Sequence, residues 1–167
     1  MLDALLGLFV LVIGIVLITS SYSKVRTPTQ AGLLSDDLLN FLAFTKVRDL
    51  NNPYAGIGGQ LWIQGLITDP DNSLLQQVGE LYAKKKFDIA GKFLENVSKE
   101  VLPSQYKYEI RIDNTMVYPI NPPSSYYASK GNTSLMLTSK QLTFGIINKT
   151  TGQAWGPYKA EVFVWEG

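Results

Sequence analysis

The side chains that most often carry out chemistry are scarce in this sequence. Its 167 residues include no cysteine and no histidine, which removes thiol redox chemistry, the usual general base and the commonest transition-metal ligand. Catalysis would have to use carboxylates, lysine, tyrosine or serine. Asp69, Asp71 and Glu109 fall in different predicted elements, and Ser124-Ser125 has no histidine partner. We therefore predict that the protein is not an enzyme and has no metal site and no cofactor.

Three Asn-X-Ser/Thr motifs could accept N-linked glycans if the protein is exported. They begin at Asn96, Asn132 and Asn148. Asn132 and Asn148 fall in predicted loops, where an acceptor would be accessible. Asn96 falls in a predicted helix and is the weakest candidate.

Other patterns exclude whole classes of function. The net charge is +1, and charged residues make up 17% of the chain, against about 25% in a typical domain. No basic face of the kind that nucleic-acid binding needs is evident, so we predict no nucleic-acid partner.

The glycines at 56, 58 and 59 do not form a phosphate-binding loop, because no predicted strand precedes them and no Gly-Lys-Ser/Thr sequence follows them. Aromatic side chains could stack on bases or sugars, but we expect those in strands to be core.

The dominant feature is an apolar segment near the amino terminus. Residues 4–18 are fifteen consecutive apolar residues, preceded by Asp3 and followed by a polar stretch that includes Lys24 and Arg26. As a helix, residues 2–18 would span about 25 Å, slightly short of a standard membrane span. A signal peptide would need a basic start, which is absent. A plain membrane anchor would place the following domain in the cytoplasm by the positive-inside rule. The segment is more consistent with a helix that lies in the membrane before assembly and in the core of a filament afterwards.

The stretch Met1-Leu2-Asp3-Ala4-Leu5-Leu6-Gly7-Leu8-Phe9-Val10 resembles the mature amino terminus of archaeal type IV pilins and pilin-like proteins. The resemblance covers residues 1–25, extends loosely over 33–113, and says little about 114–167. It implies that a short basic leader is removed just before the apolar helix. It also implies assembly into a surface filament. The sequence departs from bacterial relatives at Leu5, where they carry a glutamate.

The candidate polymerisation helix is defined by a set of residues that begin or line the apolar segment: Met1, Asp3, Ala4, Leu5, Gly7, Leu8, Leu11, Gly14 and Ile18. Gly7 and Gly14 share nearly one helical face, with Ala4 close to it. Small residues there would let helices approach closely, or they are merely tolerated in an apolar segment. Asp3 is expected to cap the helix. The resemblance suggests instead, or in addition, a pairing with the Met1 amine of a neighbouring subunit.

The rest of the chain predicts helices first and strands second. Apolar stripes at helical spacing follow Ser35-Asp36-Asp37, run over 61–67, follow Asn72 or Ser73, and follow Asp88 up to Pro103. Alternation then predicts a strand over 106–112. Further strands are expected at 116–120, 135–137, 141–147 and 159–165, with a loop over 121–132. We expect one face of the sheet to pack on helices and the other to remain available to neighbours.

These patterns predict an α+β protein with a long N-terminal apolar helix, a helical middle region and a C-terminal antiparallel β-sheet. The expected units are a polymerisation or transmembrane helix over 1–27 and a globular head over 28–167, mostly helical over 28–103 and sheet over 104–167. The predicted function is a structural subunit of a type IV pilus-like extracellular filament. It would be a homo-oligomer with outward-facing heads, membrane-inserted before assembly and glycosylated at the cell surface. The alternative is a membrane-anchored extracellular binding or adhesive domain.

Overall fold

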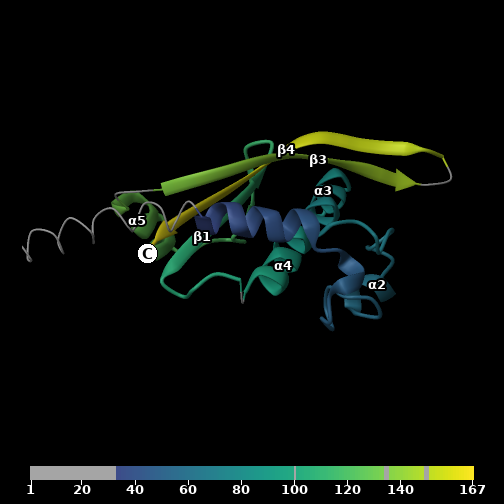
Figure 1. Ribbon diagram of the computed structural model, residues 1–167, viewed down its shortest axis with the longest axis horizontal. Coiled ribbons are helices and arrows are strands. Elements are labelled where there is room, and N and C mark those ends of the chain that lie inside the picture. The colour runs from purple at the N-terminus through teal and green to yellow at the C-terminus, as the bar shows by residue number, and fades with distance from the viewer. Residues whose placement is uncertain (1–32, 100, 134–135, 149–150) are drawn as a thin grey trace, which may run out of the picture.

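The described part of the chain is an α+β fold built on one four-stranded antiparallel sheet (Figure 1). The computed structural model describes residues 33–99, 101–133, 136–148 and 151–167. The described elements are helical residues 33–44, η1 (Val47–Asp49), α2 (Gln60–Ile63), α3 (Leu74–Ala83), α4 (Phe87–Ser98), β1 (Tyr106–Ile112), β2 (Thr115–Tyr118), α5 (Ser124–Asn132), β3 (Met136–Asn148) and β4 (Gln153–Glu166). The strand order is β2-β1-β4-β3.

The prediction that the fold begins with a long apolar helix was wrong. No long apolar helix occurs among the described residues, whose first helical residue is Leu33. Residues 1–27, on which that prediction fell, lie outside the described part of the chain. None of the helices in the described ranges is both long enough and apolar enough to cross a membrane.

The strand at 106–112 is confirmed, because its alternation matches the two faces of the sheet. Ile110 and Ile112 are buried in the core, and β1 pairs with β4 from Tyr106 opposite Glu166 to Ile112 opposite Ala160. The two short strands predicted at 135–137 and 141–147 were wrong as separate elements. They form one long strand, β3, which pairs with an equally extended β4.

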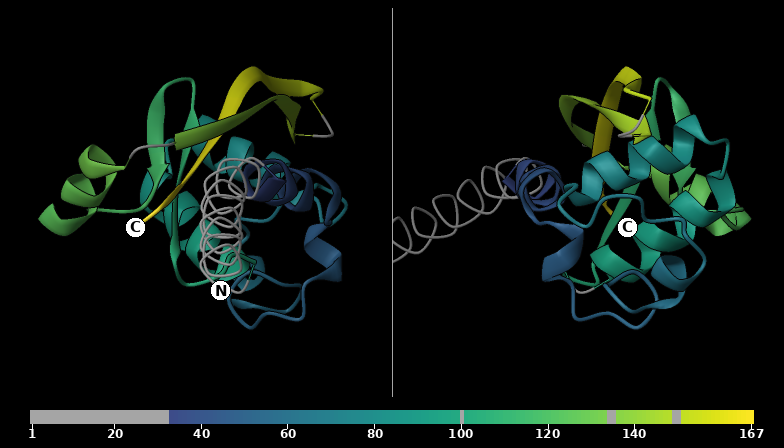
Figure 2. Two further views of the ribbon diagram at one scale, coloured as in Figure 1. Left: turned by 60° about the vertical axis from the view of Figure 1, so that its left-hand side comes forward. Right: turned by 90° about the vertical axis from the view of Figure 1, so that its right-hand side faces the viewer.

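The helices pack on one face of the sheet to form the core (Figures 1 and 2). The core side chains come from helical residues 33–44, from α3 and α4, and from the inner faces of β1, β2 and β4. They include Leu38, Leu42, Val78, Leu81, Phe93, Leu94, Ile110, Ile112, Val117, Val162 and Val164. Burying each of these side chains contributes about 1.5–3 kcal/mol. The helical stripes of the sequence are therefore core, as expected.

The helix α3 begins where the sequence predicts, and of the two candidate caps, Asn72 and Ser73, it is Ser73 that caps it. The Ser73 hydroxyl accepts from the Gln76 amide at 3.1 Å, and the Gln76 side chain accepts from the Ser73 amide at 2.9 Å. This capping box satisfies two amides that the first helical turn leaves without partners. Three predicted boundaries of other helices were wrong. The short helix α2 ends at Ile63 instead of Ile67. The helix α4 has Lys86 at its N-cap, with Asp88 in its first turn, and it ends at Ser98 instead of continuing up to Pro103.

The largest correction concerns residues 121–132, predicted as a loop, which contain helix α5. This helix lies at the end of the sheet near the carboxyl terminus (Figure 1). It packs on the face of the sheet opposite the core, where the Tyr126 ring meets the Trp165 ring edge-on at 5.3 Å. Part of the face that we expected to be available to neighbours is therefore already covered.

A buried carboxylate anchors α5. Glu109 is almost fully buried, and it accepts hydrogen bonds from Lys130 at 2.6 Å, from Tyr126 at 2.5 Å and from Arg111. Burial by itself would raise the pKa of the Glu109 carboxyl. The three donors outweigh that effect and hold its pKa below the usual value. Burial and the bond to Glu109 raise the pKa of the Tyr126 hydroxyl.

Candidate binding cleft

Trp155 on β4 is the residue around which the candidate site is built. Its side chain is only 5% exposed, and its ring stacks on Tyr158 with centroids 5.7 Å apart. Two glycines make room for the indole. A Cβ at Gly79 of α3 would collide with the six-membered ring, and a Cβ at Gly145 of β3 would lie 2.8 Å from Cζ2. The tryptophan is therefore held between a helix and a strand by the absence of side chains at both positions.

A β-bulge lies immediately beside Trp155. The β3–β4 ladder pairs Thr143 with Tyr158 and Gly145 with Trp155, so that Phe144 faces both Gly156 and Pro157. Gly156 has φ of +84°, a left-handed conformation that suits glycine and is typical of such a bulge. Bulges bend the strand that contains them and redirect its side chains. A cleft lies beside this bulge, between the distal end of the hairpin and the start of α3.

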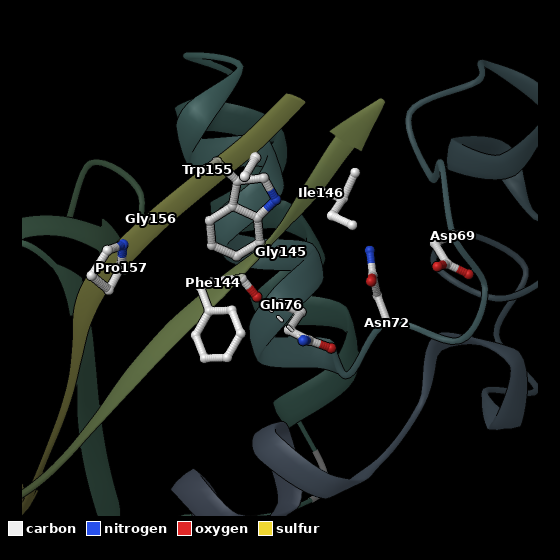
Figure 3. Close-up of a pocket in the computed structure, with 10 residues that line it drawn as sticks. Asp69, Asn72, Gln76, Phe144, Gly145, Ile146, Trp155, Gly156 and Pro157 are labelled. Atoms are coloured by element: carbon white, nitrogen blue, oxygen red, sulfur yellow. Dashed lines mark hydrogen bonds between the residues drawn. The ribbon is translucent and has the colours of Figure 1, made fainter. Parts of the chain in front are cut away.

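The cleft has a volume of about 590 Å³ and joins three segments of the chain (Figure 3). Its lining consists of Asp69, Asn72, Gln76, Phe144, Gly145, Ile146, Ala154, Trp155, Gly156 and Pro157. The volume falls within the range of small-molecule sites, and the mixture of apolar walls with a few polar groups is also typical of them.

The polar side of the cleft is held in place by α3. The Gln76 side chain donates Nε2 to the Phe144 carbonyl at 3.3 Å, which ties the helix to the bulged strand. Asn72 donates Nδ2 to the buried Glu80 carboxylate at 3.1 Å, and Thr68 donates to the same carboxylate at 2.7 Å. Lys84 donates to Glu80 at 2.5 Å and balances its charge. The 68–72 loop is thus fixed against α3, so the cleft is preformed.

One polar atom beside the cleft stands out. The indole nitrogen Nε1 of Trp155 is buried and has no hydrogen-bond partner among the described residues. Buried Trp N–H groups usually have a partner, and leaving a buried donor unpaired costs about 1–3 kcal/mol. In Figure 3 this nitrogen is on the side of the ring that faces Ile146. A hydrogen-bond acceptor that reached Trp155 Nε1 would offset the cost of leaving this donor unpaired.

The residues predicted from the sequence as a site do not lie in this cleft. Met1, Asp3 and the remainder of the predicted polymerisation helix lie outside the described residues. Asn96 is exposed on α4 and donates its Nδ2 to the Lys92 carbonyl at 2.8 Å, and Asn132 is exposed at the end of α5. Asn148 closes β3, and its side chain is not among those described. The sequence motifs are therefore dispersed over the head.

The cleft was not predicted from the sequence. One sequence signal did indicate the bulge beside it, because Gly156-Pro157 interrupts an otherwise continuous strand pattern. Nothing in the pattern indicated that Gly79 and Gly145 flank one tryptophan. Within the described ranges, no group of three or more acidic side chains is arranged to hold a metal ion. No known family model, curated protein or solved structure matches this chain.

Proposed function

We propose that the protein is a non-enzymatic structural subunit of an extracellular, type IV pilus-like filament. The observation that carries the proposal is the uninterrupted apolar run over residues 4–18, which precedes an α+β head. Such a run needs an apolar environment. A bundle of identical segments in a filament core provides such an environment. Burying apolar surface there stabilises the assembly by about 25 cal/mol per Å².

The helix over residues 33–44, which follows the predicted polymerisation segment in the sequence, supports a role in assembly. Residues 28–32 are all that separate the predicted polymerisation segment from helical residues 33–44. That helix is fixed in the core through Leu38 and Leu42, both fully buried. Because the helix that follows the segment in the sequence belongs to the packed core, the assembled segments and the heads would repeat together along a helical polymer.

The surface of the head is consistent with neighbours in an assembly. Phe44 and Ile63 are each 78% exposed, and the chain as a whole is poor in charge. Single exposed apolar side chains are ordinary in a monomer. In a filament, contacts between successive heads would cover such side chains and add to the stability that the segment supplies.

The proposal is tested by placing one charge in the apolar segment. Leu8→Arg costs about 2.5–3.5 kcal/mol at the centre of an apolar span, and we expect it to abolish filaments in the native cells. The matched control is Ser104→Arg, which places the same charge at an exposed polar residue of the head and should leave assembly intact. Electron microscopy of sheared surface material reads both variants. Normal filaments from the Leu8→Arg variant would contradict the proposal.

The second candidate is a membrane-anchored extracellular binding domain. The preformed cleft beside Trp155 favours it, because a purely structural head has no need of one. The two candidates differ in assembly state. A binding domain on an anchor would be monomeric in detergent and would keep an unprocessed amino terminus, whereas a filament subunit would be recovered from polymers.

A further inference from the structure

Helix α5 lies on the outer face of the sheet, opposite the core, without a hydrophobic anchor of its own. None of its residues is buried, and in Figure 2 it stands at the periphery of the molecule, apart from the helices that form the core. A surface helix is usually held by burial of an apolar stripe, but α5 has no such stripe. Its attachment therefore depends on individual side-chain contacts.

The described contacts of α5 with the sheet are concentrated at Glu109 and Trp165. Tyr126 and Lys130 both donate to Oε2 of the Glu109 carboxylate, at 2.5 Å and 2.6 Å. The Ser129 hydroxyl accepts from Nε1 of Trp165 at 3.3 Å. The Tyr126 ring meets the Trp165 ring edge-on, and the Lys130 ammonium lies 5.6 Å from the centre of that ring.

The two oxygens of Glu109 have separate roles. Oε2 accepts from α5, whereas Oε1 accepts from Arg111, which belongs to the same strand. The bond to Arg111 therefore stays within the sheet when α5 moves. Glu109 keeps a partner in that case, so release of the helix does not leave an isolated buried charge, which would be costly.

The charged groups around the Glu109 carboxylate come from β1, β4 and α5, since β2 contributes none. They are Lys107 and Arg111 on β1, Glu161 on β4, and Lys130 on α5. Glu161 is paired with two lysines of its own. Protonation of Glu109 therefore removes the counter-charge of Arg111 in the sheet and of Lys130 in α5.

The chain before α5 offers a point at which the helix can turn. Ile120 is fixed on α4, where its side chain occupies the space left by Gly91. The next residue, Asn121, has φ of +47°, a left-handed conformation that is typical of turns. Movement of α5 can therefore begin after Ile120 without disturbing α4.

We propose that α5 is a flap, latched by Glu109, which swings off the sheet when this carboxyl is protonated and uncovers the rings of Phe163 and Trp165 while the rest of the fold stays intact. The closed form needs the charged carboxylate. Because the pKa of Glu109 is lowered, the flap stays closed at neutral pH and opens below the pH range of an ordinary glutamate, about 4.3. This device does not depend on filament assembly, so the two proposals can fail separately.

Hydrogen exchange of the three indole N–H groups tests the flap directly. Trp165 lies under α5, Trp155 is 5% exposed on the opposite face of the sheet, and Trp62 is 38% exposed. The full-length ¹⁵N-labelled chain is held in a phosphocholine detergent, and Trp→Phe variants assign the resonances. Protection is measured from about pH 7 to about pH 3, a range that includes the titration of Glu109, and is expressed relative to free indole at each pH.

We expect the protection of Trp165 to fall by about tenfold or more in acid, because the flap opens by local unfolding. The protection of Trp155 should stay high, because the core remains closed. In Glu109→Gln, Trp165 should exchange faster at neutral pH and show no further step in acid. Glu95→Gln, a change at an exposed glutamate of α4, is the matched control and should behave as the native chain does.

Lys130→Gln breaks the same bridge from the side of the flap and leaves the sheet unchanged, so it tests the latch even if Glu109→Gln does not fold. Its Trp165 N–H should exchange about tenfold faster at neutral pH, since a hydrogen bond between charged groups is lost. Three results would overturn the proposal. They are a joint loss of protection by Trp165 and Trp155 in acid, an acid step that persists in Glu109→Gln, and native exchange of Trp165 in Lys130→Gln.

Discussion

The Ser35 hydroxyl lies 2.8 Å from the Ser139 hydroxyl, although 104 residues separate them in the sequence. Ser139 also donates a hydrogen bond to Asp36. Both contacts are at the interface where the first described helix meets edge strand β3. They connect the part of the chain nearest to the apolar segment with the sheet that forms the head.

Removing this link should weaken the head measurably. Ser139→Ala removes the hydroxyl that hydrogen-bonds with both Ser35 and Asp36, and we expect a loss of about 1–2 kcal/mol in the free energy of unfolding. Urea unfolding of the variant measures it. The exposed Ser104→Ala provides the control and should leave the midpoint unchanged. Equal midpoints for the two variants would show that the link contributes nothing.

The Glu109 cluster predicts a pH dependence of stability. Because the folded-state pKa of Glu109 is lowered, its contribution is complete above the pKa of an unfolded glutamate and is lost as the pH falls through the folded value. Glu109→Gln should cost about 3 kcal/mol at neutral pH, since it leaves Lys130 and Arg111 without their buried partner. The deficit should shrink in acid, where the native carboxyl is protonated.

Thermal melts of both proteins across the acid range test this dependence. Glu166→Gln, a change at an exposed glutamate, serves as the control and should follow the native curve throughout. A deficit in Glu109→Gln that stays constant as the pH falls would rule out titration of Glu109 as the cause.

The close packing of Gly79 against the Trp155 ring predicts that replacing this glycine by alanine destabilises the protein. Gly79→Ala lies in the middle of α3, where alanine is the better helix former by about 1 kcal/mol. The new Cβ would collide with the Trp155 ring, so we expect a net destabilisation of about 1–3 kcal/mol from overpacking. Gly131→Ala in α5, where a Cβ meets nothing, should be neutral or stabilising. Chemical denaturation with tryptophan fluorescence reads both.

Glycan attachment is predicted to differ between Asn96 and Asn132, the two acceptor residues whose side chains the structure describes. Asn132 is exposed at the carboxyl end of α5, whereas Asn96 lies within α4 with its amide bound to Lys92. Intact-mass measurement of the protein from its native cells should exceed the mass of the bare chain. Asn132→Gln should lower that mass by one glycan, and Asn96→Gln by none. A native mass equal to that of the bare chain would reject the glycan prediction.

Elements that depend on local signals could be predicted from the sequence, whereas features that depend on tertiary contacts could not. Strand β1 and the start of α3 were predictable, because alternation and the Ser73 cap are local signals. Helix α5 was not, because it has no apolar stripe and no buried residue of its own. Its Tyr126 and Lys130 instead reach Glu109, about twenty residues away in the chain. The cleft depends on Gly79 and Gly145 meeting at one indole, a tertiary contact that no local pattern encodes.

The most direct test of the filament account is mass spectrometry of filaments sheared from the native cell surface and purified by sedimentation. The account predicts that this chain is a principal component of the polymer and that its first residues resist proteolysis there, because the apolar segment is buried in the core. Filaments that lack this chain, or a chain without residues 1–27 that still enters them, would contradict it.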